Sequence, residues 1–182
     1  MVKVWTENNN IFLSEDETLA PSNAIEFPDG TQISDLKIEN GQIVFKTQQE
    51  KEQEQIAIEK SKLRNEIFDL SKKFLSKYPE AESKGWPNKV EECKDILSTN
   101  SIDQNLHPIM YSEIEALYGN IPTNFQIVVD YCNTILSKEQ SFKVFSGKIA
   151  GLRKRIEDCT NLSELQNNIT TILNNLKTTY GL

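Results

Sequence analysis

Hydrophobic and polar residues follow different patterns before and after residue 48. The first part contains short apolar runs separated by turn residues, which is typical of β-strands; they include Val2–Thr6 and Ile11–Leu13. Asp29-Gly30 and Asn40-Gly41 both accept positive φ and therefore suit tight hairpin turns. We predict that the strands on either side of Asn40-Gly41 pair as a β-hairpin: Leu36–Glu39 and Gln42–Lys46.

From residue 48 onward, apolar residues recur at intervals of three, four or seven, which predicts helices. One long helix is predicted over 48–78, ending before Pro79 because a residue that precedes proline is driven out of the α region. The longest predicted helix covers about Thr123–Asp158, with a seven-residue seam: Val128, Ile135, Phe142, Ile149 and Ile156. Such a seam is typical of a bundle helix or a coiled coil. It leaves open whether the seam closes within one chain or between copies.

A corner between helices is predicted around Trp86. Tyr78-Pro79 ends the first long helix, Gly85 breaks the chain, and Pro87 is placed to open a new helix at its first turn. We expect the neighbouring helices to pack against Trp86. Gly147 lies inside the longest helix at a cost of about 1 kcal/mol relative to alanine, and we interpret it as the mark of a close helix crossing.

These elements predict an α+β protein: a small antiparallel β N-terminal module followed by a mainly antiparallel helical bundle. A short helix over Ile109–Tyr118 and a last helix that begins at Asn161 complete the bundle. We divide the chain into a small β module (1–47), a helical connector (48–62) and a helical bundle domain (63–182). A sheet this small buries little surface by itself. It must therefore pack against the helices, a copy of itself or a partner.

Charge narrows the classes of function. The 182 residues carry a formal net charge of −7, the opposite sign from a general nucleic-acid binder, and an acidic surface disfavours anionic membranes. No apolar run approaches the roughly 20 residues of a membrane helix. Met1–Glu7 turns polar at once, so we expect no secretory signal and a cytoplasmic location. Most of the excess negative charge lies in residues 1–47, which hold three lysines and eight carboxylates.

Patterns that carry catalytic or metal chemistry are weak. His107, the single histidine, precedes a proline in a polar loop, so we interpret it as structural. Cys93, Cys132 and Cys159 are far apart on apolar helical positions and are expected to be buried free thiols, whereas a zinc site needs ligands paired at short spacing. Arg153-Lys154-Arg155 is interpreted as a solvated helix face. We predict no enzyme activity, no cofactor and no metal; a hydrolase acting through carboxylates is a competing hypothesis.

The large apolar side chains of the β module favour recognition of another protein. In one interpretation they pack on each other and on the helix from Ile56. In the other, some stay exposed or a strand edge stays open, and the module docks a partner by strand addition. The candidate partner-binding residues are Trp5, Phe12, Phe27, Ile43 and Phe45.

One stretch of the helical part resembles a known family. The pattern Tyr78-Pro79-x-Ala81-Glu82-x-x-x-Trp86-Pro87-x-x-Val90-x-Glu92 resembles one in helical regions of small bacteriophage tail proteins, which include tail-fibre assembly proteins. A Pro-led short helix, small residues in a long helix and an Arg before an Asp-containing turn follow: Pro108–Gly119, Gly147, Gly151, Arg153 and Asp158. The similarity covers about Leu63–Asn168, and the β module shows no motif of this family.

The resemblance implies a non-enzymatic phage or prophage tail protein, located in the bacterial host cytoplasm or associated with the virion. It would bind a tail-fibre or receptor-binding protein and help it to fold, trimerise or attach. The β module would capture an aggregation-prone β end of this client, and the helical bundle would act as a rigid handle. The alternative is a permanent structural component of the tail, such as a fibre connector or baseplate subunit. The seven-residue seam is also compatible with a homo-oligomer, in which it would pack between copies of the chain.

Overall fold

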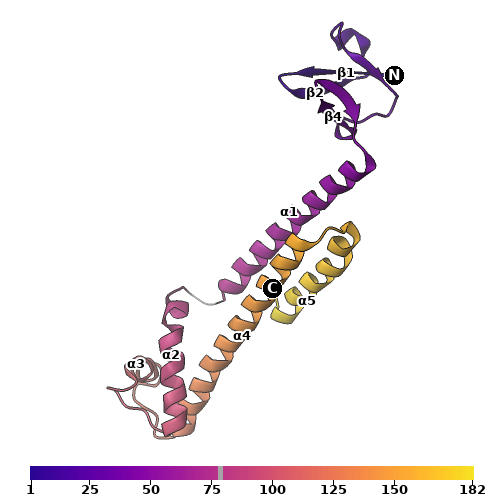
Figure 1. Ribbon diagram of the computed structural model, residues 1–182. Helices are drawn as coiled ribbons and strands as arrows, with labels where there is room; N and C mark the ends of the chain where they lie inside the picture. Colours follow the sequence, from indigo (N-terminus) through magenta and orange to yellow (C-terminus); the bar gives the residue numbers. More distant parts are fainter. Residues whose placement is uncertain (78–79) are drawn as a thin grey trace. The chain divides into compact units, whose positions relative to one another are not determined.

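The structure is a computed structural model that describes residues 1–77 and 80–182, except for the side chains of 80–85. It confirms the α+β class: the described residues form five strands in two small sheets, followed by five α-helices (Figure 1). The chain divides into two compact units. The β unit comprises Met1–Ser61 with Thr160–Ser163, and the helical unit comprises Lys62–Cys159 with Glu164–Leu182.

The β unit contains two antiparallel sheets. Its strands are β1 (Val2–Glu7), β2 (Asn10–Ser14), β3 (Ile25–Phe27), β4 (Leu36–Glu39) and β5 (Gln42–Phe45), and its 3-10 turns are η1 (Glu17–Leu19) and η2 (Ile33–Asp35). The first sheet has the order β2-β1-β3, and β4 pairs with β5 in the second. Because successive strand residues point to opposite faces, one face of each sheet supplies the core. The buried core residues are Val2, Val4, Phe27, Leu36 and Ile43, with Ile11 and Leu13 packed against them.

One of the two predicted hairpin turns is confirmed and the other is wrong. Asn40 (φ 53°) and Gly41 (φ 78°) join β4 to β5, as predicted. Asp29 and Gly30 instead lie in a turn closed by a 3.2 Å hydrogen bond from the Thr31 N–H to the Pro28 carbonyl, and the chain continues into η2. The preceding strand, β3, pairs with β1 from the start of the chain, a non-local pairing that the turn residues do not encode.

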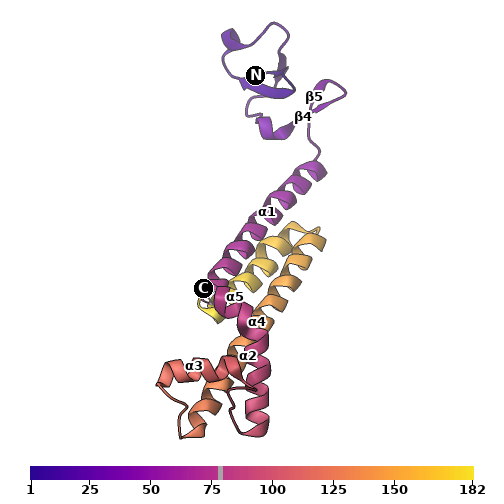
Figure 2. The same cartoon turned by 90° about the vertical axis from the view of Figure 1, so that its left-hand side faces the viewer.

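The helical part is built from elements that follow the predicted order. They are α1 (Gln48–Leu75), α2 (Glu80–Thr99), α3 (Pro108–Tyr118), α4 (Phe125–Asp158), the π-helical η3 (Glu164–Ile169) and α5 (Thr170–Tyr180). Within the helical unit, α4 lies alongside the later part of α1 and alongside α5, while α2 and α3 pack near the beginning of α4 (Figures 1 and 2).

The predicted corner around Trp86 is partly wrong. Tyr78 and Pro79 lie outside the described residues. Helix α2 already begins at Glu80, so Gly85 does not break the chain and Pro87 lies inside the helix rather than in its first turn. Trp86 is buried and packs edge-on against Phe142 of α4, with ring centroids 5.4 Å apart. A proline inside a helix removes one hydrogen bond, and burial of the adjacent tryptophan offsets that loss.

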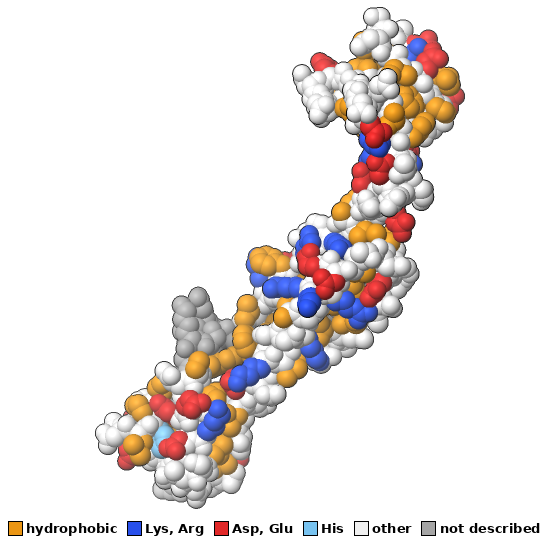
Figure 3. Space-filling view, viewed as in Figure 1, with side chains coloured by type: hydrophobic (Ala, Val, Ile, Leu, Met, Phe, Trp, Pro, Cys, Tyr) orange, Lys and Arg blue, Asp and Glu red, His pale blue; other side chains and the backbone are white. Residues whose placement is uncertain are grey.

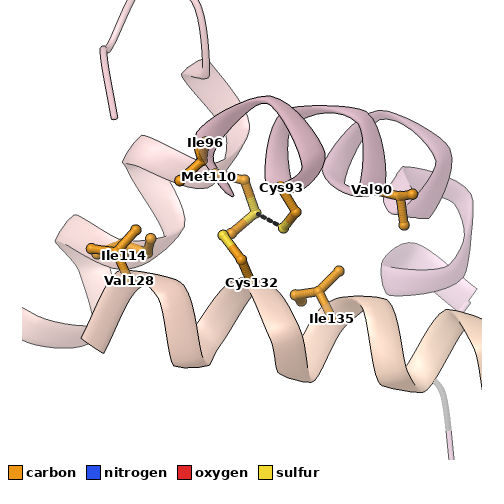
Figure 4. Packing of buried hydrophobic residues seen from close by; sticks show 8 residues of the cluster. All are labelled: Val90, Cys93, Ile96, Met110, Ile114, Val128, Cys132 and Ile135. Atoms are coloured by element: carbon orange, nitrogen blue, oxygen red, sulfur yellow. Dashed lines mark hydrogen bonds between the residues drawn. The ribbon is translucent and has the colours of Figure 1, made fainter. Parts of the chain in front are cut away.

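The seam of α4 closes within the chain's own helical unit. Val128, Ile135, Ile149 and Ile156 are buried and Phe142 is half-buried. At one end the seam joins a cluster with α2 and α3 (Figure 4): Val90, Cys93, Ile96, Met110, Ile114, Val128, Cys132 and Ile135. The close crossing predicted at Gly147 is wrong, because a Cβ added there would meet no atom within 4 Å.

Candidate partner-binding surface

The β1–β2 hairpin places Trp5 and Phe12 directly opposite each other. Asn8 (φ 51°) and Asn9 (φ 64°) form a two-residue turn in which both positions have positive φ, the geometry whose twist matches that of the flanking strands. Asparagine tolerates this conformation better than most residues. The turn sets the register in which Trp5 faces Phe12.

The Trp5–Phe12 pair, called the aromatic pair below, lies on the face of the sheet opposite the core. Val4 is buried, so its neighbour Trp5 points to the other face. The rings stack with centroids 5.8 Å apart and an interplanar angle of 17°. Phe12 remains 38% exposed and Trp5 is half-buried. Hydrophobic side chains reach the surface of the β unit (Figure 3), and an exposed aromatic pair of this kind is a common feature of protein-binding surfaces.

Two of the five predicted partner-binding residues are not available to a partner. Phe27 and Ile43 lie in the core of the β unit, with 7% and 9% of their surface exposed. Phe27 faces inward because it is paired with Val2 on the core side of β1. Phe45 packs edge-on against Phe27 at 5.2 Å between ring centroids, yet stays 47% exposed. The prediction therefore continues with Trp5, Phe12 and Phe45.

Beside the aromatic pair, β2 has one edge without backbone pairing, and η2 and β4 lie close to this strand. In a hairpin closed by a two-residue turn, the flanking residues form a hydrogen-bonded pair, and bonded and non-bonded pairs then alternate. The pairs Glu7–Asn10 and Trp5–Phe12 are therefore joined by backbone hydrogen bonds. The N–H and C=O groups of Ile11 and Leu13 point away from β1, and we call them the β2 edge. Within the described chain, no backbone hydrogen bond joins this edge to another segment.

Ion pairs attach the second sheet to the beginning of α1. Lys37 contacts Glu50 at 2.7 Å, Lys51 contacts Asp35 at 2.6 Å, and Lys46 contacts Glu54 at 2.7 Å. Hydrogen bonds from Lys37 and from the backbone and hydroxyl of Thr47 lower the pKa of Glu50 from 4.5 to about 2.

Thr47 and Glu50 form a reciprocal cap at the start of α1. The Thr47 hydroxyl accepts from the Glu50 N–H at 3.2 Å, and the Glu50 carboxylate accepts from the Thr47 N–H at 2.8 Å. The sequence signal for this cap is Thr-x-x-Glu before a helix, which hydrophobic periodicity does not reveal.

His107 has a structural role at the beginning of α3. It is buried, and its Nε2 lies 2.8 Å from a carboxylate oxygen of Asp95. Its Nδ1 accepts a hydrogen bond from the Asp103 N–H at 3.1 Å, so Nε2 carries the proton that Asp95 accepts. Glu92 accepts hydrogen bonds from the N–H groups of Ile109 and Met110 at the same helix start. Both ring nitrogens are engaged in holding the connection between α2 and α3.

The three cysteines are buried thiols that form no disulfide, as predicted. Cys93 and Cys132 belong to the cluster of α2, α3 and α4, where the Cys93 thiol lies 3.6 Å from the Met110 sulfur (Figure 4). The hydrogen bond with Cys132 and burial raise the pKa of the Cys93 thiol, which makes it a poor nucleophile. Among the described residues, no three His, Cys, Asp or Glu side chains are grouped to hold a metal ion.

No described helix combines the length and apolar character needed to span a membrane. The sequence matches no protein-family model and no curated protein, and the fold matches no solved structure. The candidate surface therefore stands on its own geometry: an exposed aromatic pair beside an unpaired strand edge.

Proposed function

We propose that this chain is a non-enzymatic phage or prophage tail protein that binds a tail-fibre or receptor-binding protein in the host cytoplasm and assists its folding or assembly. The observation that carries the binding role is the aromatic pair beside the β2 edge. The identity of the client comes from the resemblance of the helical part to tail-fibre assembly proteins.

The proposed mechanism is strand addition. An extended segment of the client pairs with the N–H and C=O groups of Ile11 and Leu13, which supplies backbone hydrogen bonds without regard to sequence. Its side chains on the outer face then contact Phe12 and Trp5. Unpaired strands of an unassembled β-rich protein associate with one another, so covering one of them keeps the client soluble until its own partner strand arrives.

Co-expression with the tail-fibre gene of the same genome tests this function. The yield of soluble fibre trimer is measured without the chain, with the wild-type chain, and with the F12S or F68S variant. Phe68 is the matched control because it is also an exposed phenylalanine, but lies on α1 in the helical unit. We expect the wild type and F68S to raise the yield and F12S to lose most of the effect.

Equal trimer yields with and without the chain would contradict an assembly role. Purified particles separate the remaining alternative: a permanent connector or baseplate subunit would be present in fixed stoichiometry, whereas an assembly factor would be absent. Amide chemical shifts of F12S, compared with the wild type, establish that the variant keeps the hairpin.

A further inference from the structure

We infer that the β2 edge binds an extended, basic segment, with Lys or Arg near both ends and an apolar residue between them. This inference rests on the proposed function for its binding surface and adds the chemical class of the client segment. It depends on where the β unit leaves negative charge without a partner.

The segment of the chain that contains β2 carries only negatively charged side chains. Between Val4 and Leu36 the chain has seven carboxylates and no Lys or Arg. Three of the seven are neutralised by groups from elsewhere: Glu26 pairs with Lys3 at 2.7 Å, Asp29 pairs with the N-terminal ammonium group, and Asp35 pairs with Lys51.

The other four carboxylates are exposed and stand at the two ends of β2. They are Glu7, Glu15, Asp16 and Glu17. Across the described part of the chain, no ion pair within 4 Å reaches any of them. Lys3, opposite Ser14 on β1, interacts with Glu17 at longer range while its ammonium group pairs with Glu26. Hydrogen bonds from the hydroxyl and N–H of Thr18 lower the pKa of Asp16, so this group stays charged well below neutral pH.

The position of these carboxylates matches the length of a paired strand. Glu7 lies next to the hairpin turn at one end of β2, and Glu15–Glu17 follow its other end. The five residues of β2 extend over about 14 Å. A strand added to the β2 edge would bring its two ends close to the two acidic groups and its middle close to Phe12. Basic end residues and an apolar central residue complement this arrangement.

The same charges select against other occupants. Two copies of this chain that paired edge to edge would bring like charges together, which is a recognised device against self-association of strand edges. An acidic strand meets the same repulsion. Charge complementarity of this kind acts mainly on the encounter rate and on specificity, and it weakens as salt screens exposed charges.

Binding of matched peptides to the full-length, ¹⁵N-labelled chain tests the inference. The probes are three synthetic peptides of equal length: a strand-forming peptide with terminal lysines and a central valine, the same peptide with glutamates for lysines, and the lysine peptide interrupted by proline. We expect the lysine peptide to shift the amide signals of Ile11 and Leu13 and the indole signal of Trp5. It should bind at least about tenfold more tightly than the glutamate peptide, and more weakly as salt rises.

Two sets of substitutions locate the effect. Neutralising three of the acidic groups, in E7Q/E15Q/E17Q, should reduce the affinity for the lysine peptide about tenfold. Asp16 is left unchanged because it caps η1. The control E52Q/E91Q/E115Q removes the same charge from exposed glutamates on α1, α2 and α3 and should leave the affinity unchanged.

Three outcomes would overturn the inference: no shift with the lysine peptide at millimolar concentration, equal affinity for the lysine and glutamate peptides, or equal loss in the two triple variants. The acidic groups would then only protect the edge from self-association. If E7Q/E15Q/E17Q still raises the fibre yield while F12S does not, the charge inference fails and the proposed function stands. If the lysine peptide binds as expected but the chain does not change the fibre yield, the proposed function fails instead.

Discussion

Replacing Phe74 by alanine is expected to remove the largest single contribution to the packing of α1, α4 and α5. Phe74 is 2% exposed. Its ring stacks on Phe145 of α4 at 3.8 Å between centroids and meets Tyr180 of α5 edge-on at 5.4 Å. Truncation of a buried phenylalanine to alanine costs about 3–5 kcal/mol. We therefore expect F74A to lower the free energy of unfolding of the helical unit by about 4 kcal/mol.

Phe68 provides a matched control on the same helix. Its side chain is 53% exposed. The Lys72 ammonium group lies over the Phe68 ring, 4.2 Å from the ring centroid. An exposed cation–π contact is worth about 0.5–1 kcal/mol. The F68A substitution should therefore cost less than about 1 kcal/mol, although it removes the same number of atoms.

Urea unfolding followed by Trp86 fluorescence measures both variants. A W5F background leaves Trp86 as the only tryptophan, and Trp86 reports on the helical unit because it packs against Phe142. We expect the free energy of unfolding to fall several times more in F74A than in F68A. The slope of this free energy against urea concentration should be unchanged in both. Equal losses, or a loss below about 1 kcal/mol for F74A, would refute the reasoning that this aromatic stack holds the three helices together.

Four further predictions concern individual positions. G147A should stabilise the helical unit by about 1 kcal/mol in urea unfolding, because a Cβ there meets no atom and alanine favours a helix. Because the pKa of Glu50 is lowered from 4.5 to about 2, its contribution is complete above pH 4.5 and lost as pH falls towards 2; circular dichroism should show α1 fraying in that window. Cys93 and Cys132 should react with iodoacetamide at least about a thousandfold more slowly in the folded chain than in urea. H107A should cost about 2 kcal/mol because it removes a buried ring and both of its hydrogen bonds.

Each of these has a result that would contradict it, and the first two also have a control variant. G119A should be destabilising, since Gly119 has φ 79°, and a loss of stability in G147A would contradict its open surroundings. The acid transition should flatten in E50Q, and an unchanged transition would assign it to other carboxylates. Thiol labelling at the unfolded rate would show that the cluster is open in solution. An H107A variant as stable as the wild type would contradict the structural role of the ring.

Long helices with regular apolar spacing were predicted well because burial of one face decides them. The seam residues Val128, Ile135, Ile149 and Ile156 are buried as expected, and α3 ends at Gly119. The start of α2 was not predictable in the same way. Gly85 and Pro87 are strong local signals against a helix, yet the burial of Trp86 outweighs them, and that burial depends on Phe142, a residue distant in sequence.

The candidate site was predictable as a set of residues but not as a surface. Phe12 and Phe45 remain exposed and Trp5 is half-buried, whereas Phe27 and Ile43 belong to the core. Trp5 and Phe12 lie on the face opposite the core, which follows from their pairing across β1 and β2. Phe27 is placed in the core by the pairing of β3 with β1, a contact between segments about 20 residues apart that no local pattern encodes. Ile43 and Phe45 share one face of β5 and differ in burial by their position along the strand. The four unpaired carboxylates around β2 could be recognised only once the ion pairs of the others were known.

The sulfur atoms at the meeting point of α2, α3 and α4 have a consequence for chemical ageing. Peroxide converts a thioether to a sulfoxide, which is polar and fits an apolar interior poorly. Met110 is fully buried beside Cys93 and Cys132, so oxidants reach it only when these helices separate. A sulfoxide at Met110 would therefore be a lasting chemical record that a given molecule had once opened, readable by mass long after the helices had closed again.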